Sequence, residues 1–137
     1  MNLEIAEEFY LKLYESLKSN IKLQDHDCRV YVKAPKEAKY PFLTINYRNV
    51  TWKNLHDIAQ YELEIDFNLF IKSNNAISIA TNIFKIVSQN IIEVIGDFAD
   101  LDVIAFHGSN LLFELSKDLL VDKIVNKFQI TLQEKIV

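Results

Sequence analysis

The stretch YELEIDFNLFI, residues 61–71, decides the fold class. Its odd-numbered positions are all large and apolar, and the even-numbered positions between them include Glu62, Glu64, Asp66 and Asn68. A period of two residues is the pattern of a β-strand with one buried and one solvated face. Strands of this kind belong to antiparallel sheets that are covered on one side only. The stretch therefore predicts a one-sided sheet whose covering layer comes from elsewhere in the chain.

Two amphipathic segments can supply that layer. Residues 2–18 carry apolar side chains at helical spacing, with Asn2 as an N-cap and glutamates in the first turns. A second helix is predicted from about residue 75 to 95, after the polar segment 73–75 and with Gly96 in the C′ position. The apolar positions of this helix cover far more than one face. Either the first helix packs on its second side, or part of the surface meets another subunit.

The remaining strands are shorter or interrupted. Pro35 and Pro41 bracket a loop, because proline cannot donate a ladder hydrogen bond. The other expected elements are a brief strand at 29–33, an alternating strand at 42–47, a projecting connection at 49–58, a strand at 101–115 interrupted at 107–110, and a half-exposed strand at 127–133. This order predicts one α+β domain over residues 1–137, two-layered, with a mostly antiparallel sheet and two main helices packed on one face.

Composition excludes several classes of function. Fifteen Lys and Arg face 19 Asp and Glu, and only two of the basic residues are arginines. We therefore expect no sequence-specific contact with nucleic acid. No apolar run reaches the ~20 residues that span a bilayer, and the N-terminal segment is acidic where a secretory signal is basic, so we expect a cytosolic protein with no membrane partner. The single Cys28 rules out an intramolecular disulfide and a cysteine zinc site.

Four arrangements of polar residues resemble fragments of catalytic or metal sites, but each has a simpler interpretation. The adjacent side chains of residues 25–28, DHDC, diverge where a metal needs converging ligands. The pair His56 and Asp57 could activate a nucleophile, but the sequence has no Gly-x-Ser-x-Gly nucleophile elbow. His107 beside Gly108 is typical of a bend, and the acidic row of residues 62–66 is typical of a solvated strand face. We predict no enzymatic activity, no metal and no cofactor.

Six segments and their order carry a family resemblance. They are the N-terminal helix, RVYVKAPKEAKYPFLTI (29–45), VTWKN (50–54), YELEIDFNLF (61–70), IKSNNAISIATNIFKIV (71–87) and KFQITLQE (127–134). In this order they resemble the small tail-completion or tail-terminator proteins of tailed phages, prophages and gene transfer agents. The similarity spans most of the chain, although Phe70 stands where relatives often have a tryptophan.

The resemblance implies a structural role. Subunits of this family form a ring, typically hexameric, that caps the growing tail tube, ends its polymerisation and presents a surface for joining the head. The implied partners are further copies of the chain, the tail tube protein and a head-completion or connector protein. The implied location is the virion tail, reached by assembly in the host cytoplasm. Such a ring requires a heterologous interface that closes.

Three groups of residues are candidates for the contacts of such a ring. The subunit interface is expected at Ile77, Phe84, Ile91 and Ile95, the tube contact at Trp52, Lys53, Leu55 and His56, and an acidic lumen face that repels DNA phosphates at Glu62, Glu64 and Asp66. The alternative function is a small adaptor or chaperone that binds one protein partner through the same apolar helix face. The stoichiometry of the complex distinguishes the two.

Overall fold

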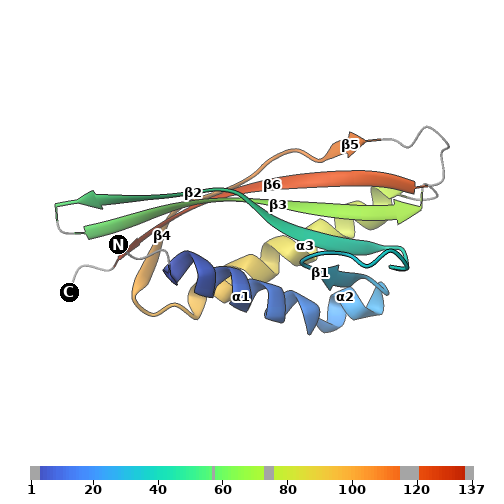
Figure 1. Ribbon diagram of the computed structural model, residues 1–137, viewed down its shortest axis with the longest axis horizontal. Coiled ribbons are helices and arrows are strands. Elements are labelled where there is room, and N and C mark those ends of the chain that lie inside the picture. The colour runs from blue at the N-terminus through green and yellow to red at the C-terminus, as the bar shows by residue number, and fades with distance from the viewer. Residues whose placement is uncertain (1–3, 57, 73–75, 115–120, 135–137) are drawn as a thin grey trace.

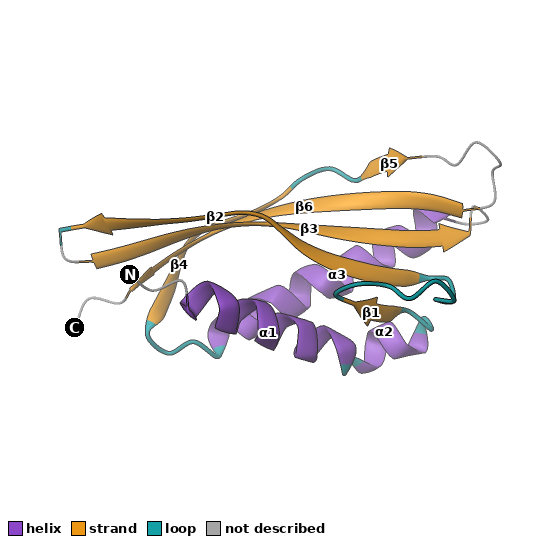
Figure 2. Cartoon of the chain, in the orientation of Figure 1, coloured by secondary structure: helices purple, strands orange, loops and turns teal. Residues whose placement is uncertain are grey.

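The computed structural model describes residues 4–56, 58–72, 76–114 and 121–134. Within these residues, three helices lie on one face of a six-stranded sheet and leave the other face open (Figures 1 and 2). The predicted two-layer α+β architecture is confirmed. None of the described helices is long and apolar enough to cross a membrane.

The sheet is antiparallel except at one edge. Its strands are β1 (Arg29–Tyr31), β2 (Phe42–Leu55), β3 (Ile58–Lys72), β4 (Leu101–Gly108), β5 (Leu112–Glu114) and β6 (Val121–Glu134). The order across the sheet is β1-β2-β3-β6-β4, and β5 pairs with β6 beyond the end of β4. Among the strands that the structure describes, β1 and β2 are the one parallel pair. The loop between them holds both prolines, as predicted.

The central strand β3 has the two faces that its sequence predicts. Its odd-numbered residues from Ala59 to Ile71 are all buried, on the face of the sheet that carries the helices. They meet inward-facing residues of both neighbours; Leu63, for example, pairs with Val50 of β2 and with Ile130 of β6. At ~1.5–3 kcal/mol for each large apolar side chain that is buried, this row is the main source of cohesion between the two layers.

Three helices cover the sheet. They are α1 (Glu4–Lys18), α2 (Ile21–Asp25) and α3 (Ala76–Gly96). The short α2 was not predicted; it begins at Asn20, whose side-chain oxygen accepts hydrogen bonds from the backbone N–H groups of Lys22 at 2.9 Å and Leu23 at 3.2 Å. The predicted C′ role of Gly96 was wrong, because this residue is the last of α3 and does not have a positive φ.

Two tyrosines fix α1 on β2. The Tyr10 hydroxyl donates to the carbonyl of Ile45 at 2.7 Å, and the Tyr47 hydroxyl donates to the carbonyl of Ala6 at 2.6 Å. The two rings lie 5.2 Å apart. Burial, and then the neighbouring Tyr10, raise the pKa of Tyr47. Both hydroxyls therefore act as neutral donors that link the helix layer to the sheet.

The expected projecting connection at 49–58 was wrong, because β2 continues to Leu55. The pairing with β3 shifts register between Tyr47 and Asn49, which leaves Arg48 as a β-bulge. Residues 43, 45 and 47 pair with inward-facing residues of β3 before the bulge, whereas residues 50 and 52 do so after it. The apolar pattern changes phase at this point, so a continuous strand looks irregular in the sequence.

The interruption predicted at 107–110 is present but begins two residues later, because His107 and Gly108 still belong to β4 and pair with Gln129 and Phe128 of β6. Strands β4 and β5 lie end to end along β6 and are separated by residues 109–111. The Ser109 N–H donates to the carbonyl of Lys127 at 2.8 Å, and the Lys127 N–H donates to the Ser109 Oγ at 3.0 Å. These bonds hold the segment between the two strands against β6, so β4 and β5 together form one edge of the sheet.

Candidate functional surfaces

The residues expected to contact the tube form the tip of the β2–β3 hairpin. This hairpin extends past the helix layer (Figure 1). Leu55 is the last residue of β2, and His56 occupies the turn with a φ of 48°. Trp52 is half-buried opposite Tyr61 and packs on the core, whereas Lys53 is exposed and pairs with Glu62 at 3.5 Å. The tip therefore exposes Lys53 and His56, whereas Trp52 packs against the core and anchors the hairpin to it.

The expected subunit interface on α3 is divided by the fold. Phe84, Ile91 and Ile95 are buried inside the protomer, whereas Ile77 is 70% exposed. Helix α1 packs against α3, and Ser16 Oγ donates to the Asn90 Oδ1 at 3.1 Å across the two helices. Helix α1 does pack on α3, as one of the two interpretations of the apolar surplus predicted, whereas Phe84 lies beside Phe106 and Phe128 of the sheet. On α3, large apolar exposure is limited to Ile77 and Ile92.

The acidic row lies on the open face of the sheet, but cations partly offset its charge. Arg48, the bulge residue, forms ion pairs of 3.1 Å with Glu64 and with Asp66. Lys53 pairs with Glu62. The three carboxylates share these two cations, so one negative charge of the three is not offset by the pairs, and the row repels phosphate less strongly than three unpaired acids would. Sequence spacing along β3 could not show this, since the cations come from β2.

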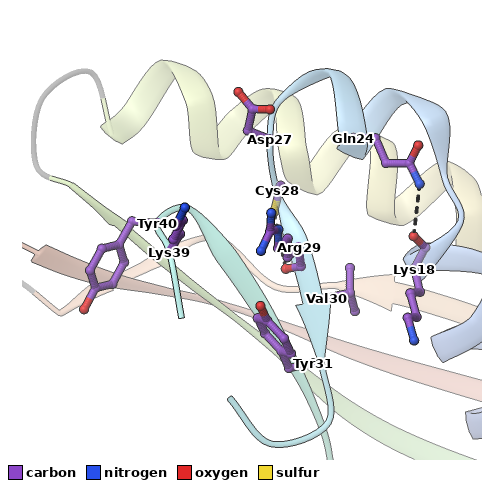
Figure 3. Close-up of a pocket in the computed structure, with 9 residues that line it drawn as sticks. All are labelled: Lys18, Gln24, Asp27, Cys28, Arg29, Val30, Tyr31, Lys39 and Tyr40. Carbon is purple, nitrogen blue, oxygen red and sulfur yellow. Dashed lines mark hydrogen bonds between the residues drawn. The ribbon is translucent and has the colours of Figure 1, made fainter. Parts of the chain in front are cut away.

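A hollow of about 630 Å³ lies around β1 (Figure 3). Its lining includes Lys18, Arg29 and Lys39 and one carboxylate, Asp27. Figure 3 shows Lys18 and Lys39 on opposite sides of β1, so these charges do not converge on one point. A reactive centre needs converging groups. The hollow is a basic surface beside the end of the sheet, and it lacks the geometry of a catalytic site.

The predicted chemical candidates stay apart. The Cys28 thiol is buried, and burial raises its pKa to about 12, so it remains protonated at neutral pH. His56 lies in the hairpin turn and His107 on β4, with β3 and β6 between their strands. Asp57 lies outside the described residues. Across the described parts of the chain, no three His, Cys, Asp or Glu side chains are placed to hold a metal ion.

The sequence did not reveal that apolar exposure concentrates at the edges of the sheet. Four large apolar side chains on β4 and β5 are exposed: Val103, Ile104, Leu112 and Phe113. Near β1, at the opposite edge, Val32 and Tyr40 are exposed as well. These residues belong to segments whose edge position depends on strand order, and strand order is not visible in local periodicity.

Comparison with protein-family models finds no match, and neither does comparison with curated proteins. Among solved structures, a chain of the structure described as "Virion of native gene transfer agent (GTA) particle" has a similar fold, with a TM-score of 0.56 and 11% sequence identity. The similarity covers 88% of this chain and 91% of that chain. At this identity the likeness shows that the two chains share a fold, and that they share it over nearly their whole lengths.

Proposed function

We propose that this chain is a structural protein of a phage-type virion, and that it forms a ring that caps the tail tube. In this role it ends tube polymerisation and presents the surface that joins the head. The observation that carries the proposal is the fold shared, end to end, with a chain of a gene transfer agent virion. The sequence resemblance to tail-completion proteins supports the same role independently of that likeness.

The geometry supplies surfaces for such a role. The β2–β3 hairpin extends beyond the helices and presents Lys53 and His56 at its tip, which suits a contact with the end of a tube. Further copies of the chain and a head-completion or connector protein would occupy other surfaces. We place the protein in the virion tail after assembly in the host cytoplasm. A hexamer is the stoichiometry we expect from the family resemblance.

Assembly with the tube protein tests the proposal. The chain is purified alone and mixed with the tail tube protein encoded beside it, and mass is measured by light scattering while tube length is measured by electron microscopy. We expect ring-sized oligomers at high concentration or on tubes, and shorter, capped tubes. A strict monomer under both conditions would refute the proposed ring.

A pair of substitutions at the hairpin tip tests the tube contact. Lys53→Glu combined with His56→Ala changes exposed groups, so the fold and the ring should survive while tube capping is lost. Lys85→Glu, at an exposed position on α3, makes the same charge change as Lys53→Glu and serves as the control. Capping that is equally strong in both variants would exclude the hairpin tip as the contact.

The adaptor interpretation predicts a different stoichiometry. Ile77 and Ile92 are exposed on α3, so a single partner protein could dock there. A stable one-to-one complex that is lost in Ile77→Asp with Ile92→Asp, without any homo-oligomer, would favour the adaptor over the ring.

A further inference from the structure

We propose that copies of this chain join edge to edge, with β1 of one copy pairing as an antiparallel strand with β5 of the next. Because the ring is itself the proposed function, this pairing rests on it and names the two surfaces that close it. A contact between two different edges of the same protein is heterologous, which is the type of interface that generates rings. The evidence lies in strand order, register, exposure and charge.

The two edges are open to different degrees. At one end of the sheet, β1 is the last strand in the order, and at the other end β4 and β5 are. All three residues of β5 are exposed, with Leu112 at 46% and Phe113 at 42%. Soluble proteins usually protect edge strands with charge, proline or a covering element. An exposed apolar edge is therefore the mark of a strand that pairs with another chain.

Part of the opposite edge is protected, and this selects β1 as the partner. Next to β1, the carbonyl of Ile45 on β2 already accepts a hydrogen bond from the Tyr10 hydroxyl of α1. A strand from another copy would have to displace that bond to pair with β2 there. Strand β1 extends the sheet by one strand beyond β2 over residues 42–44 only. It is the part of this edge that reaches furthest from the sheet centre.

Strand directions and register make the two edges compatible. β1 runs parallel to β2, β2 is antiparallel to β3, β3 to β6, and β6 to β5, so β1 and β5 run in opposite directions. They also lie level with each other. Following the pairs across the sheet places Arg29 in line with Glu114, Val30 with Phe113, and Tyr31 with Leu112. Sheets joined in this register would form an antiparallel ladder with one ion pair and two apolar pairs.

Charge distinguishes the two edges over a larger area. At the β1 edge, β1 and the loop that follows it carry four exposed cations, Arg29, Lys33, Lys36 and Lys39, against one acid, Glu37. At the opposite edge, β4 and β5 carry two exposed acids, Asp102 and Glu114, and no Lys or Arg. Opposite fields at opposite edges steer one copy onto the next in a head-to-tail orientation, and repel contacts between like edges.

Glu114 already has one ionic neighbour, and this affects the size of the expected effect. Its carboxylate lies 3.7 Å from Lys123 Nζ and remains largely exposed. In the joined sheet it would lie between Lys123 and the incoming Arg29. An exposed ion pair changes affinity only modestly, so a single charge reversal should raise the dissociation constant of the oligomer roughly fivefold. The apolar pairs contribute the rest of the affinity.

A charge swap tests the pairing. Arg29→Glu and Glu114→Arg should each weaken self-association, and the double variant should return to within about twofold of the original chain because the pair is restored with reversed signs. Lys85→Glu and Glu8→Arg make the same charge changes at exposed positions on helices and should leave association unchanged. Oligomerisation is measured by sedimentation at several salt concentrations, and the effect of the reversals should shrink as salt rises.

Disulfide trapping tests the register. In a Cys28→Ala background, Tyr31→Cys with Leu112→Cys places a thiol on each edge at facing positions, where opposed Cβ atoms of an antiparallel pair lie ~4.5–5.5 Å apart. Mild oxidation should give a ladder of covalent oligomers. Tyr31→Cys with Asp102→Cys moves the second thiol to β4, a different level of the sheet, and should give no ladder.

The outcomes separate this pairing from the proposed function. Oligomers that respond to neither charge reversal and yield no ladder would overturn the β1–β5 contact and leave the ring in place. A chain that stays monomeric at high concentration and with tube protein present would overturn both. Rescue by the charge swap together with a ladder from the facing thiols would establish the edge-to-edge contact.

Discussion

Asn20 joins three helices, and its replacement by alanine should destabilise the fold measurably. Its Oδ1 caps α2 by accepting from the N–H groups of Lys22 and Leu23. Its Nδ2 donates to the Oδ1 of Asn90 on α3 at 2.9 Å, and Asn90 is buried. Ser16 on α1 donates to the same oxygen. Asn20→Ala therefore removes a cap and one of two donors to a buried acceptor.

The expected loss follows from these two contributions. Losing an Asn cap costs ~0.5–2 kcal/mol, and losing a neutral buried hydrogen bond costs ~0.5–1.5 kcal/mol. Ser16 still satisfies the Asn90 oxygen, so the second contribution should lie at the low end. We expect Asn20→Ala to lower the free energy of unfolding by about 1–3 kcal/mol, and the melting temperature by roughly 3–10 °C for a chain of this size.

Two further substitutions separate the contributions. Asn20→Ser keeps a capping oxygen but lacks the amide that reaches α3, so it should lose about half as much as Asn20→Ala. Ser19→Ala removes a hydroxyl that donates only to carbonyl groups of α1, Glu15 at 2.9 Å and Ser16 at 3.4 Å, and should change stability by less than ~0.5 kcal/mol. Urea denaturation followed by circular dichroism measures all three. A stability of Asn20→Ala within ~0.5 kcal/mol of the original chain would refute the reasoning.

Two other substitutions and the ionisation of one buried thiol test the packing of the protomer. Tyr47→Phe removes the hydroxyl that donates to Ala6 and should cost ~1 kcal/mol in urea denaturation. Gly108→Ala should cost ~1 kcal/mol or more, because the added Cβ would lie 3.1 Å from the ring of the buried Phe128. Burial raises the pKa of the Cys28 thiol to about 12, so about one thiol in ten thousand is ionised in the folded chain at pH 8. Cys28 should therefore react with a thiol reagent only as fast as the chain unfolds. For the same reason, stability should fall as pH rises from about 9 towards 12.

The controls for these changes are close in structure. Tyr31→Phe alters a half-buried tyrosine of β1 and should leave stability within ~0.5 kcal/mol. Gly96→Ala places a Cβ where nothing lies within 4 Å, at the end of a helix, so it should be neutral or stabilising. Rapid labelling of Cys28 in the native chain, or a Gly108→Ala variant as stable as the original, would contradict the packing described here.

The sequence predicted the layers of this fold better than it predicted their connections. The period of two in β3 and the helical spacing in α1 and α3 are strong local signals, because each element has one buried face. The length of β2 could not be predicted, since the bulge at Arg48 moves its apolar residues from odd to even positions. The parallel pairing of β1 with β2 depends on tertiary contacts, and no local pattern encodes it.

The exposure of the candidate surfaces also depends on contacts between distant parts of the chain. The apolar surplus of α3 was visible in the sequence, but the identity of the element that covers it was not. In the structure α1 packs against α3, and Phe84 and Ile91 are buried in the core of the protomer. The acids of β3 were visible too, whereas Arg48 reaches two of them only because β2 lies alongside. Residues far apart in sequence decide which surfaces remain available.

The short length of the proposed contact has a consequence for assembly. Three residues of β1 facing three of β5 form only a few ladder hydrogen bonds, each contributing ~0.5–1.5 kcal/mol net, so a single contact is weak. A closed ring gives every subunit two such contacts, whereas an open chain of the same copies always lacks one. Closure therefore makes assembly cooperative, and a surface that holds several copies side by side raises their effective concentration. In the proposed function the end of a tail tube is such a surface, so the proposed edge contact would form rings where a tube ends and remain mostly unpaired elsewhere.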